Sequence, residues 1–377
     1  MDLFNNILSS DIFNIVKENI RVVLKRSMIK FHTQMPRSAS ANGVYDFDER
    51  FYDDWHVGFW AGIYYMAYEM FGDKTFLNYA DGITESLQEK TVNNTIWKSA
   101  DEGYIYIPSC VNFFKIHKDY SSIEAICLAA DRMVESMLGQ DKKNLNLKYS
   151  KAGGVTNLNL LRLVGIMSKN NEYIRFADKY EKVILENNIF PDGTCVFSVL
   201  NPQNSTVREI KKYNASVFRP YVLLLHGLAL RYASTHSEKY LSLFQKIIEK
   251  YMTIFYEMMI NGASGSDHDT FHDTTSICIC NCAIMELIKN LDKDSPLIRA
   301  YLNIFKYNIN FVISDYLISK EKNSQGLING GRFDLFTGEQ INGSVVMGDY
   351  FFMESLMHLD YNYKSCWDID NFLKYIC

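Results

Sequence analysis

The sequence predicts an all-α protein and, more closely, an (α/α)6 barrel, a ring built from six helical hairpins. Proline is rare, with 6 residues among 377, and apolar residues recur mainly three and four positions apart, as in an α-helix. The alternation typical of a β-strand is limited to short pieces such as residues 195–200. A short polar turn also recurs between helical stretches, which indicates an internal repeat.

Each recurring turn lies between an apolar helix and a more amphipathic one, the pattern of an αα-hairpin. Such turns lie at the start of five segments, residues 72–81, 118–131, 169–178, 236–241 and 292–298. A further turn at residues 326–331 precedes the last helix, so about six hairpins are expected. The intervals vary over roughly 45 to 70 residues and no polar capping repeat is visible, so a closed ring is favoured over an open solenoid.

Length and composition suit one large domain with a substantial core. The chain is 47% hydrophobic and 14% aromatic. We expect a single barrel over residues 1–377, with an amphipathic helix within residues 1–25 packed on it. The net charge of −5 argues against a surface that binds the phosphates of a nucleic acid.

The N-terminal sequence and the hydropathy predict a soluble, cytoplasmic protein with no membrane partner. Residues 1–8 lack the basic segment and the continuous apolar stretch of a signal peptide. No window of about 20 residues is apolar enough to cross a bilayer. The sequence leaves two assembly states open, a monomer or a homodimer.

The cysteines predict reduced thiols and no metal site. The chain has 8 cysteines, dispersed except for Cys278, Cys280 and Cys282. Metal sites prefer longer gaps between ligands and a second ligand cluster, and neither is evident. Because this segment continues into the apolar residues 283–288, we interpret it as a helix with small, packable side chains.

Unusual polar and aromatic residues cluster just before the apolar helices. These entrances are residues 53–62, 99–110, 151–161, 213–220, 264–275 and 344–352. In a ring of hairpins they meet at one end, which is where we expect a cleft and the chemistry.

The first entrance combines Trp55, His56, Phe59 and Trp60 and runs into an apolar helix predicted over residues 63–70. Flat aromatic faces beside acids and a histidine suit a sugar ring, which offers apolar C–H faces and a hydroxyl rim. Large aromatic residues are also typical of a core, and both interpretations remain open. The two glycines of this stretch, four positions apart, predict close approach of another backbone or of a ligand.

Several of these entrances resemble motifs of glycoside hydrolase family 88, the unsaturated glucuronyl hydrolases. Residues 55–62 match the family's W-x-x-G-F-W-x-G at every fixed position. Asp101 and Gly103 match its H-D-L-G-F element, with Tyr104 in place of Phe. Residues 272–275 and 348–351 resemble its R-D-T-S and G-D-Y-Y elements, and the likeness covers nearly the whole chain.

This resemblance implies an (α/α)6 barrel and a reaction without a cofactor on an acidic oligosaccharide. In that reaction a carboxylic acid protonates the C4=C5 bond of an unsaturated uronic acid and water adds at C5. The resulting hemiketal then collapses and releases the remaining sugar. Two aspartates serve the family, of which one corresponds to Asp101. The other belongs to I-D-x-x-x-N-x-x-L-L, and counting back from Asn157 places Gly153 there.

The resemblance therefore implies Asp101 as the catalytic residue. The substrate-binding candidates are Trp55, His56, Phe59, Trp60, Asn157, Arg219, Asp273 and Asp349. Arg219 is the arginine that remains of a divergent family motif and is suited to pairing with a sugar carboxylate. Asp273 and Asp349 fit helix caps equally well.

Other polar groups admit two interpretations. Asp267, His268, Asp269 and His272 share one loop, where they fit either acid–base work or solvated and capping roles. His56 and His226 fit hydrogen-bonded structural histidines.

Two functions follow. The first is a carbohydrate-active enzyme that hydrates the C4=C5 bond of an unsaturated uronic acid. The alternative is a divergent or inactive barrel that binds or processes a saccharide, because a glycine at position 153 transfers no proton.

Overall fold

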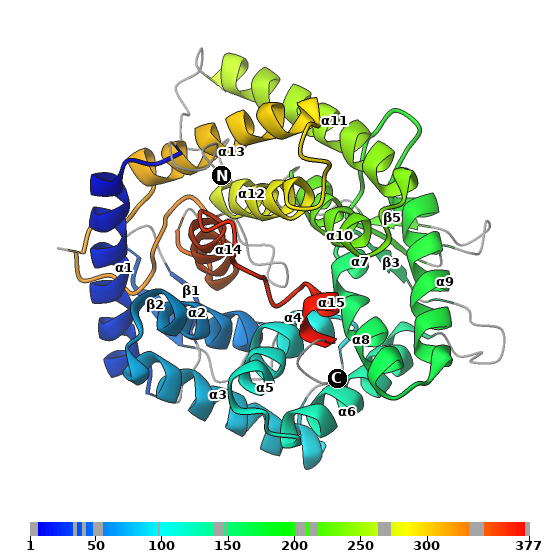
Figure 1. Ribbon diagram of the computed structural model, residues 1–377, viewed down its shortest axis with the longest axis horizontal. Helices are drawn as coiled ribbons and strands as arrows, with labels where there is room; N and C mark the ends of the chain where they lie inside the picture. Colours follow the sequence, from blue (N-terminus) through cyan, green and yellow to red (C-terminus); the bar gives the residue numbers. More distant parts are fainter. Residues whose placement is uncertain are drawn as a thin grey trace.

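The computed structural model forms a barrel of two concentric rings of helices (Figure 1). It describes residues 7–32, 36–39, 43–47, 56–96, 99–138, 147, 149–200, 202, 209–211, 218–262, 273–320, 322–331 and 343–373. The predicted all-α class and (α/α)6 architecture are confirmed.

The inner ring consists of helices with almost no exposed face. Its members are α2 (His56–Phe71), the broken helix α4, η2 and α5 (Glu102–Tyr106, Ile107–Val111, Asn112–His117), α7 and α8 (Gly154–Asn157, Asn159–Met167), α10 (Arg219–Thr235), α12 (Thr274–Ile288) and α14 (Val346–Met357). Neighbours in this order pack on one another, and α14 packs back on α2, which closes the ring. Every residue of α12 is buried, as a helix enclosed on all sides requires.

The outer ring consists of amphipathic helices that bury one face on the inner ring. They are α1 (Ser10–Phe31), α3 (Lys74–Val92), α6 (Ser121–Met137), α9 (Asn171–Asn188), α11 (Glu238–Gly262) and α13 (Pro296–Asp315). The helix expected within residues 1–25 runs on to Phe31, and Figure 1 shows α1 as a member of the outer ring.

Left-handed residues end four of the inner helices and allow the chain to turn back. Gly72, Lys118, Lys169 and His236 have φ of 66°, 58°, 55° and 50°. The next outer helix then begins with a side-chain cap in some hairpins, such as Asp73, which accepts a bond from the Thr75 N–H at 3.0 Å. The predicted hairpin turns at these positions are confirmed.

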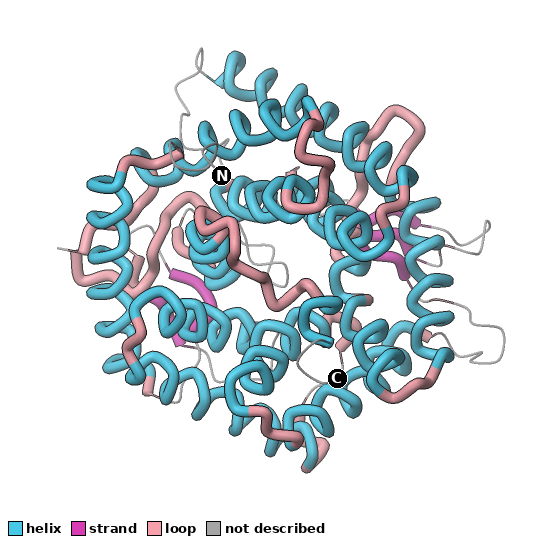
Figure 2. Tube along the Cα trace, in the orientation of Figure 1, coloured by secondary structure: helices cyan, strands magenta, loops and turns pink. Residues whose placement is uncertain are grey.

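Short strands lie outside the inner ring (Figure 2). An antiparallel pair is formed by β1 (Pro36–Ala39) and β2 (Tyr45–Phe47). A three-stranded antiparallel sheet has the order β3 (Tyr149–Lys151), β4 (Ser198–Leu200), β5 (Glu209–Lys211). Of the predicted strand at residues 195–200, the last three residues form β4, and Cys195 makes an isolated antiparallel bridge with Ile189. The chain passes from β3 directly towards α7, which fixes Lys151 near the start of an inner helix.

The glycine-rich start of α2 is part of the helix. The helix begins at His56, so the predicted start at residue 63 is wrong. A Cβ at Gly58 would lie 2.3 Å from the carbonyl oxygens of Tyr104 and Ile105, and one at Gly62 would lie 2.5 Å from the Tyr350 ring. The predicted close approach is confirmed, and at Gly58 the approaching group is a backbone.

The helix predicted through the C-x-C-x-C segment is confirmed as α12. All three cysteines are fully buried, and burial raises the pKa of each thiol. Among the described helices, none has the length and apolar character needed to cross a bilayer.

Candidate active site

The candidate site lies at the end of the barrel where the inner helices begin. Each inner helix before α14 is followed by an outer helix that returns the chain, so the entrances to the inner helices share one end. Asp101 stands immediately before α4, and Gly153 stands immediately before α7. These two helices pack on each other, so the two aligned positions of the family motifs are neighbours in space.

Asp101 presents a carboxylate that is oriented and partly open to solvent. Lys151 Nζ lies 2.8 Å from its Oδ2, and Asn157 Nδ2 lies 3.4 Å from its Oδ1. The side chain of Asp101 is 19% exposed and that of Lys151 is 31% exposed. Both oxygens therefore have a donor while the group remains accessible, as proton transfer to a ligand requires.

Asn157 ties the segments of the site together. Its Nδ2 also donates to the carbonyl of Gly153 at 3.3 Å, and its Oδ1 accepts the backbone N–H of Tyr104 at 2.9 Å. The residue is fully buried. Its amide thus fixes the Asp101 carboxylate relative to α4 and α7.

Gly153 provides no acid, and a tyrosine hydroxyl occupies the space beside it. A Cβ built on Gly153 would lie 2.8 Å from Tyr104 Oη. That hydroxyl donates to the Gly153 carbonyl at 3.2 Å. Burial raises the pKa of Tyr104 well above its ordinary value, and the negative charge of Asp101 raises it further. The phenol therefore stays protonated across the physiological range.

Glu102, next to Asp101, belongs to a buried ion pair. Its carboxylate accepts bonds from Arg132 Nε and Nη2, each at 3.3 Å, and from the Ser99 N–H at 3.1 Å. Burial raises the pKa of Glu102, and the charge of Arg132 opposes that rise. This pair links α4 to α6 and leaves Asp101 as the accessible acid of the α4 entrance.

Arg219 and Asp273 form a buried ion pair at the starts of α10 and α12. Arg219 Nη2 lies 3.1 Å and 3.0 Å from the two carboxylate oxygens of Asp273. Asp273 occupies the N-cap position of α12 but makes no side-chain bond to the helix N–H groups. A sugar carboxylate that binds Arg219 would therefore compete with Asp273 for the guanidinium.

Asp349 lies in the first turn of α14, whose N-cap position is taken by Val345. Its carboxylate accepts bonds from Tyr45 Oη at 2.7 Å and from the N–H groups of Leu327 and Ile328 at 2.9 and 3.1 Å. Burial raises its pKa to about 7, and these bonds oppose the rise. The residue is fully enclosed and anchors the segment that leads to α14.

The aromatic residues of the first entrance lie in the core. Phe59 and Trp60 have no exposed surface, and His56 is also buried. Trp60 packs edge-on against Phe31 and Tyr45. Of the two interpretations left open for Phe59 and Trp60, this placement favours packing. Trp55 lies outside the described residues.

The predicted hydrogen bonding of His226 is wrong. The ring is buried between Phe351 and Trp367, and neither nitrogen has a hydrogen-bond partner among the described residues. Burial lowers its pKa to about 3, so it is neutral at physiological pH. The loop with Asp267, His268, Asp269 and His272 lies outside the described residues.

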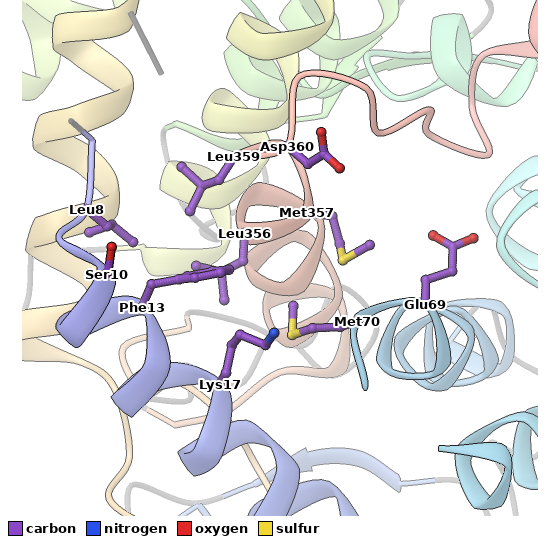
Figure 3. Close-up of a pocket in the computed structure, with 10 residues that line it drawn as sticks. All are labelled: Leu8, Ser10, Phe13, Lys17, Glu69, Met70, Leu356, Met357, Leu359 and Asp360. Atoms are coloured by element: carbon purple, nitrogen blue, oxygen red, sulfur yellow. The ribbon is translucent and has the colours of Figure 1, made fainter. Parts of the chain in front are cut away.

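A cavity of about 400 Å³ lies at the opposite end of the barrel (Figure 3). Figure 3 shows its lining side chains, which come from the start of α1, the end of α2 and the end of α14. None of the candidate site residues lines it. The chemistry suggested by Asp101 and this cavity are therefore at different places.

Sequence reasoning missed Lys151. It stands inside the third entrance, but nothing in its immediate sequence indicates a carboxylate partner fifty residues earlier. Lys151 lies two positions before Gly153, where the family motif has an aspartate. A lysine so close to that position is the signal that could have identified it.

Comparison with known proteins confirms the predicted resemblance. No family model matches the chain. An unsaturated chondroitin disaccharide hydrolase of Streptococcus agalactiae is 23% identical, over 93% of each chain. An unsaturated glucuronyl hydrolase of Bacillus sp. strain GL1 is 19% identical, over 92% of this chain and 96% of the relative.

Solved structures of similar proteins agree with the fold. The crystal structure of the Bacillus sp. GL1 unsaturated glucuronyl hydrolase matches 94% of this chain and 98% of its own with a TM-score of 0.82 at 18% identity. That of the Streptococcus agalactiae unsaturated glucuronyl hydrolase matches 96% and 94%, with a TM-score of 0.81 at 20% identity.

Proposed function

We propose that this protein is a hydrolase that removes an unsaturated uronic acid from the end of an acidic oligosaccharide. Similarity to unsaturated glucuronyl and chondroitin disaccharide hydrolases over almost the whole chain supports the substrate class. The observation that carries the proposal is the Asp101 carboxylate, which is held by Lys151 and Asn157 at the functional end of the barrel and remains partly exposed.

In the proposed reaction, Asp101 transfers protons in both directions. Its carboxylic acid form gives a proton to C4 of the C4=C5 bond, which leaves positive charge at C5 and a carboxylate at Asp101. Water adds at C5 and returns a proton to that carboxylate, so the acid is regenerated. The hemiketal at C5 then collapses and releases the rest of the saccharide. Because C4 and C5 are bonded to each other, one carboxyl group with two oxygens can serve both steps.

Lys151 supports the proposed chemistry electrostatically. Its ammonium, 2.8 Å from Oδ2, stabilises the carboxylate that forms when Asp101 gives up its proton. It also places positive charge where an acidic saccharide would bind. Arg219 is a second cation at the same end of the barrel, and its charge is balanced by Asp273 in the free protein.

The remaining binding candidates are retained as proposals with the roles their positions support. Asn157 orients Asp101. Phe59, Trp60 and Asp349 act through packing and through anchoring of the segments around the site. We propose that His56 and Asp273 support the site from buried positions. Trp55 stays a predicted substrate-binding residue. We also propose a cytoplasmic location and a monomer or homodimer.

A substrate comparison tests the proposed function. The protein is incubated with an unsaturated disaccharide and with its saturated counterpart, and both the ultraviolet absorbance of the C4=C5 bond and the released sugar are followed. We expect absorbance loss and sugar release from the unsaturated compound alone. Release from the saturated compound would contradict the mechanism. Binding of unsaturated disaccharides without turnover of any would favour the alternative of a saccharide-binding barrel.

A further inference from the structure

We propose that the Tyr104 hydroxyl is a ligand-binding group of the active site. In this proposal the hydroxyl fills the space of the side chain absent at position 153 and serves as a neutral hydrogen-bond donor to the bound saccharide. The inference rests on the proposed function for the identity of the ligand, but its spatial part is independent of activity.

The glycine at position 153 is explained by Tyr104 and not by the backbone. Gly153 has φ −69° and ψ −10°, a helical conformation open to any residue. A Cβ there would lie 2.8 Å from Tyr104 Oη, but 3.4 Å and 3.5 Å from Cε2 and Cζ of the ring. The hydroxyl oxygen alone makes the contact too close. With phenylalanine at position 104, a side chain at position 153 would meet the ring at ordinary van der Waals distance.

The position of the Tyr104 hydroxyl is restrained, because both the ring and the backbone of the residue are held by neighbours. The Tyr104 ring packs against Phe59 and Trp367, with centroids 5.6 and 5.7 Å apart. Its backbone N–H donates to Asn157 Oδ1, the same amide that contacts Asp101. Tyr104 Oη is therefore fixed relative to the catalytic carboxylate, as a positioning group must be.

The electrostatic surroundings favour a donor that keeps its proton. The negative charge of Asp101 raises the pKa of Tyr104, and the positive charge of Arg219 opposes that rise. A carboxylate at position 153 would add a second anion beside Asp101, whereas the phenol adds none. The bond from the hydroxyl to the Gly153 carbonyl is long, at 3.2 Å, and can be exchanged for a bond to a saccharide oxygen.

Thermal unfolding tests the spatial part of the proposal with Gly153→Ala, Tyr104→Phe and the double variant. We expect Gly153→Ala to lower Tm by on the order of 3 °C through overpacking. Adding Tyr104→Phe to it should recover most of that loss, so the two substitutions are coupled. A Gly153→Ala variant as stable as wild type, or a double variant in which the effects simply add, would overturn this part.

Kinetics tests the functional part. Tyr104→Phe should lower kcat/KM for an unsaturated disaccharide about tenfold, because one hydrogen bond to the ligand is lost. Tyr301→Phe, which removes a hydroxyl from a buried tyrosine of the outer helix α13, is the matched control and should leave kcat/KM unchanged. Full kcat/KM in Tyr104→Phe would overturn the proposed donor role.

A third variant gives a readout that a purely structural tyrosine would not move. Tyr104→Phe/Gly153→Asp places a second carboxyl group in the site, so the pH profile of kcat/KM should gain an ionisation absent from wild type. An unchanged profile in a folded variant would contradict the assigned position. If wild type turns over no unsaturated saccharide, the proposed function fails. Calorimetric binding of the disaccharide to wild type and Tyr104→Phe then decides the donor role.

Discussion

At the scale of single residues, the site depends on how one carboxylate is held. Asp101 takes a bond from an ammonium on one oxygen and from an amide on the other; the first donor, Lys151, ends β3 and the second, Asn157, ends α7. The family pattern supplies a second aspartate between these two positions, where this chain has Gly153. The proposed chemistry therefore rests on Asp101 and on the groups that surround it.

Lys151→Met tests the contribution of the ammonium. We expect kcat/KM to fall about tenfold, because the carboxylate formed on proton transfer loses its charged partner. The remaining activity should also depend less on salt, since less positive charge attracts the acidic substrate. Steady-state kinetics at low and high salt measures both effects.

Lys179→Met is the matched control, because Lys179 is exposed on the outer helix α9. It should change neither kcat/KM nor its salt dependence. A Lys151→Met enzyme that behaves like this control would show that the ion pair plays no part in catalysis.

At the scale of elements, the barrel is specified by the contrast between buried, mainly apolar inner helices and amphipathic outer ones. The spacing of apolar residues in the sequence shows that contrast, so the helices and their turns could be predicted. The start of α2 could not, because Gly58 lowers helix propensity locally and the compensating contact, the backbone of Tyr104 and Ile105, is distant in sequence.

Glycine substitutions in two helices test this packing. Gly58→Ala should destabilise the protein by about 1–3 kcal/mol, because the new methyl group would lie 2.3 Å from carbonyl oxygens of α4. Gly82→Ala on α3 has open space around it and should stabilise by about 0.5–1 kcal/mol through the higher helix propensity of alanine. Denaturant unfolding measures both values. Equal effects at the two positions would contradict the packing described for α2 and α4.

The site itself was predictable only in part. The motif around Asp101 and the glycine at position 153 could be recognised from the sequence, because the short motifs occur in the same order as in the family. The contacts of Lys151 and Tyr104 depend on how α4, α7 and β3 meet, which no local pattern reports. Likewise, the sequence could not show that the His226 ring lacks a hydrogen-bond partner among the described residues, because this follows from how the core closes around it.

At the scale of the whole molecule, closing the ring buries ionisable groups, and their pKa values then differ between the folded and the unfolded protein. Glu354 of α14 is fully buried and accepts a bond from Ser365 Oγ at 2.6 Å. Burial raises its pKa from 4.5 to about 8. Between these values the folded protein holds a proton that the unfolded chain has lost, so the free energy of unfolding falls as pH rises.

Glu354→Gln should remove this dependence. The free energy of unfolding of wild type should exceed that of the variant most at pH 5, and the difference should shrink towards pH 8, by at most about 1.4 kcal/mol per pH unit. Urea unfolding at several pH values provides the measurement. A difference that grows with pH would show that the carboxyl group is ionised in the folded barrel.

In the closed barrel, the Asp101 carboxylate is oriented and partly exposed at the end where the inner helices begin. We propose that Asp101 carries the proton transfer there. The most direct measurement is the turnover of an unsaturated disaccharide by Asp101→Asn beside wild type, with Asp292→Asn in an exposed turn as the control for the same chemical change. We predict a loss of about 10²–10⁴-fold in kcat for Asp101→Asn and none for Asp292→Asn. Wild-type turnover by a folded Asp101→Asn protein would contradict the account.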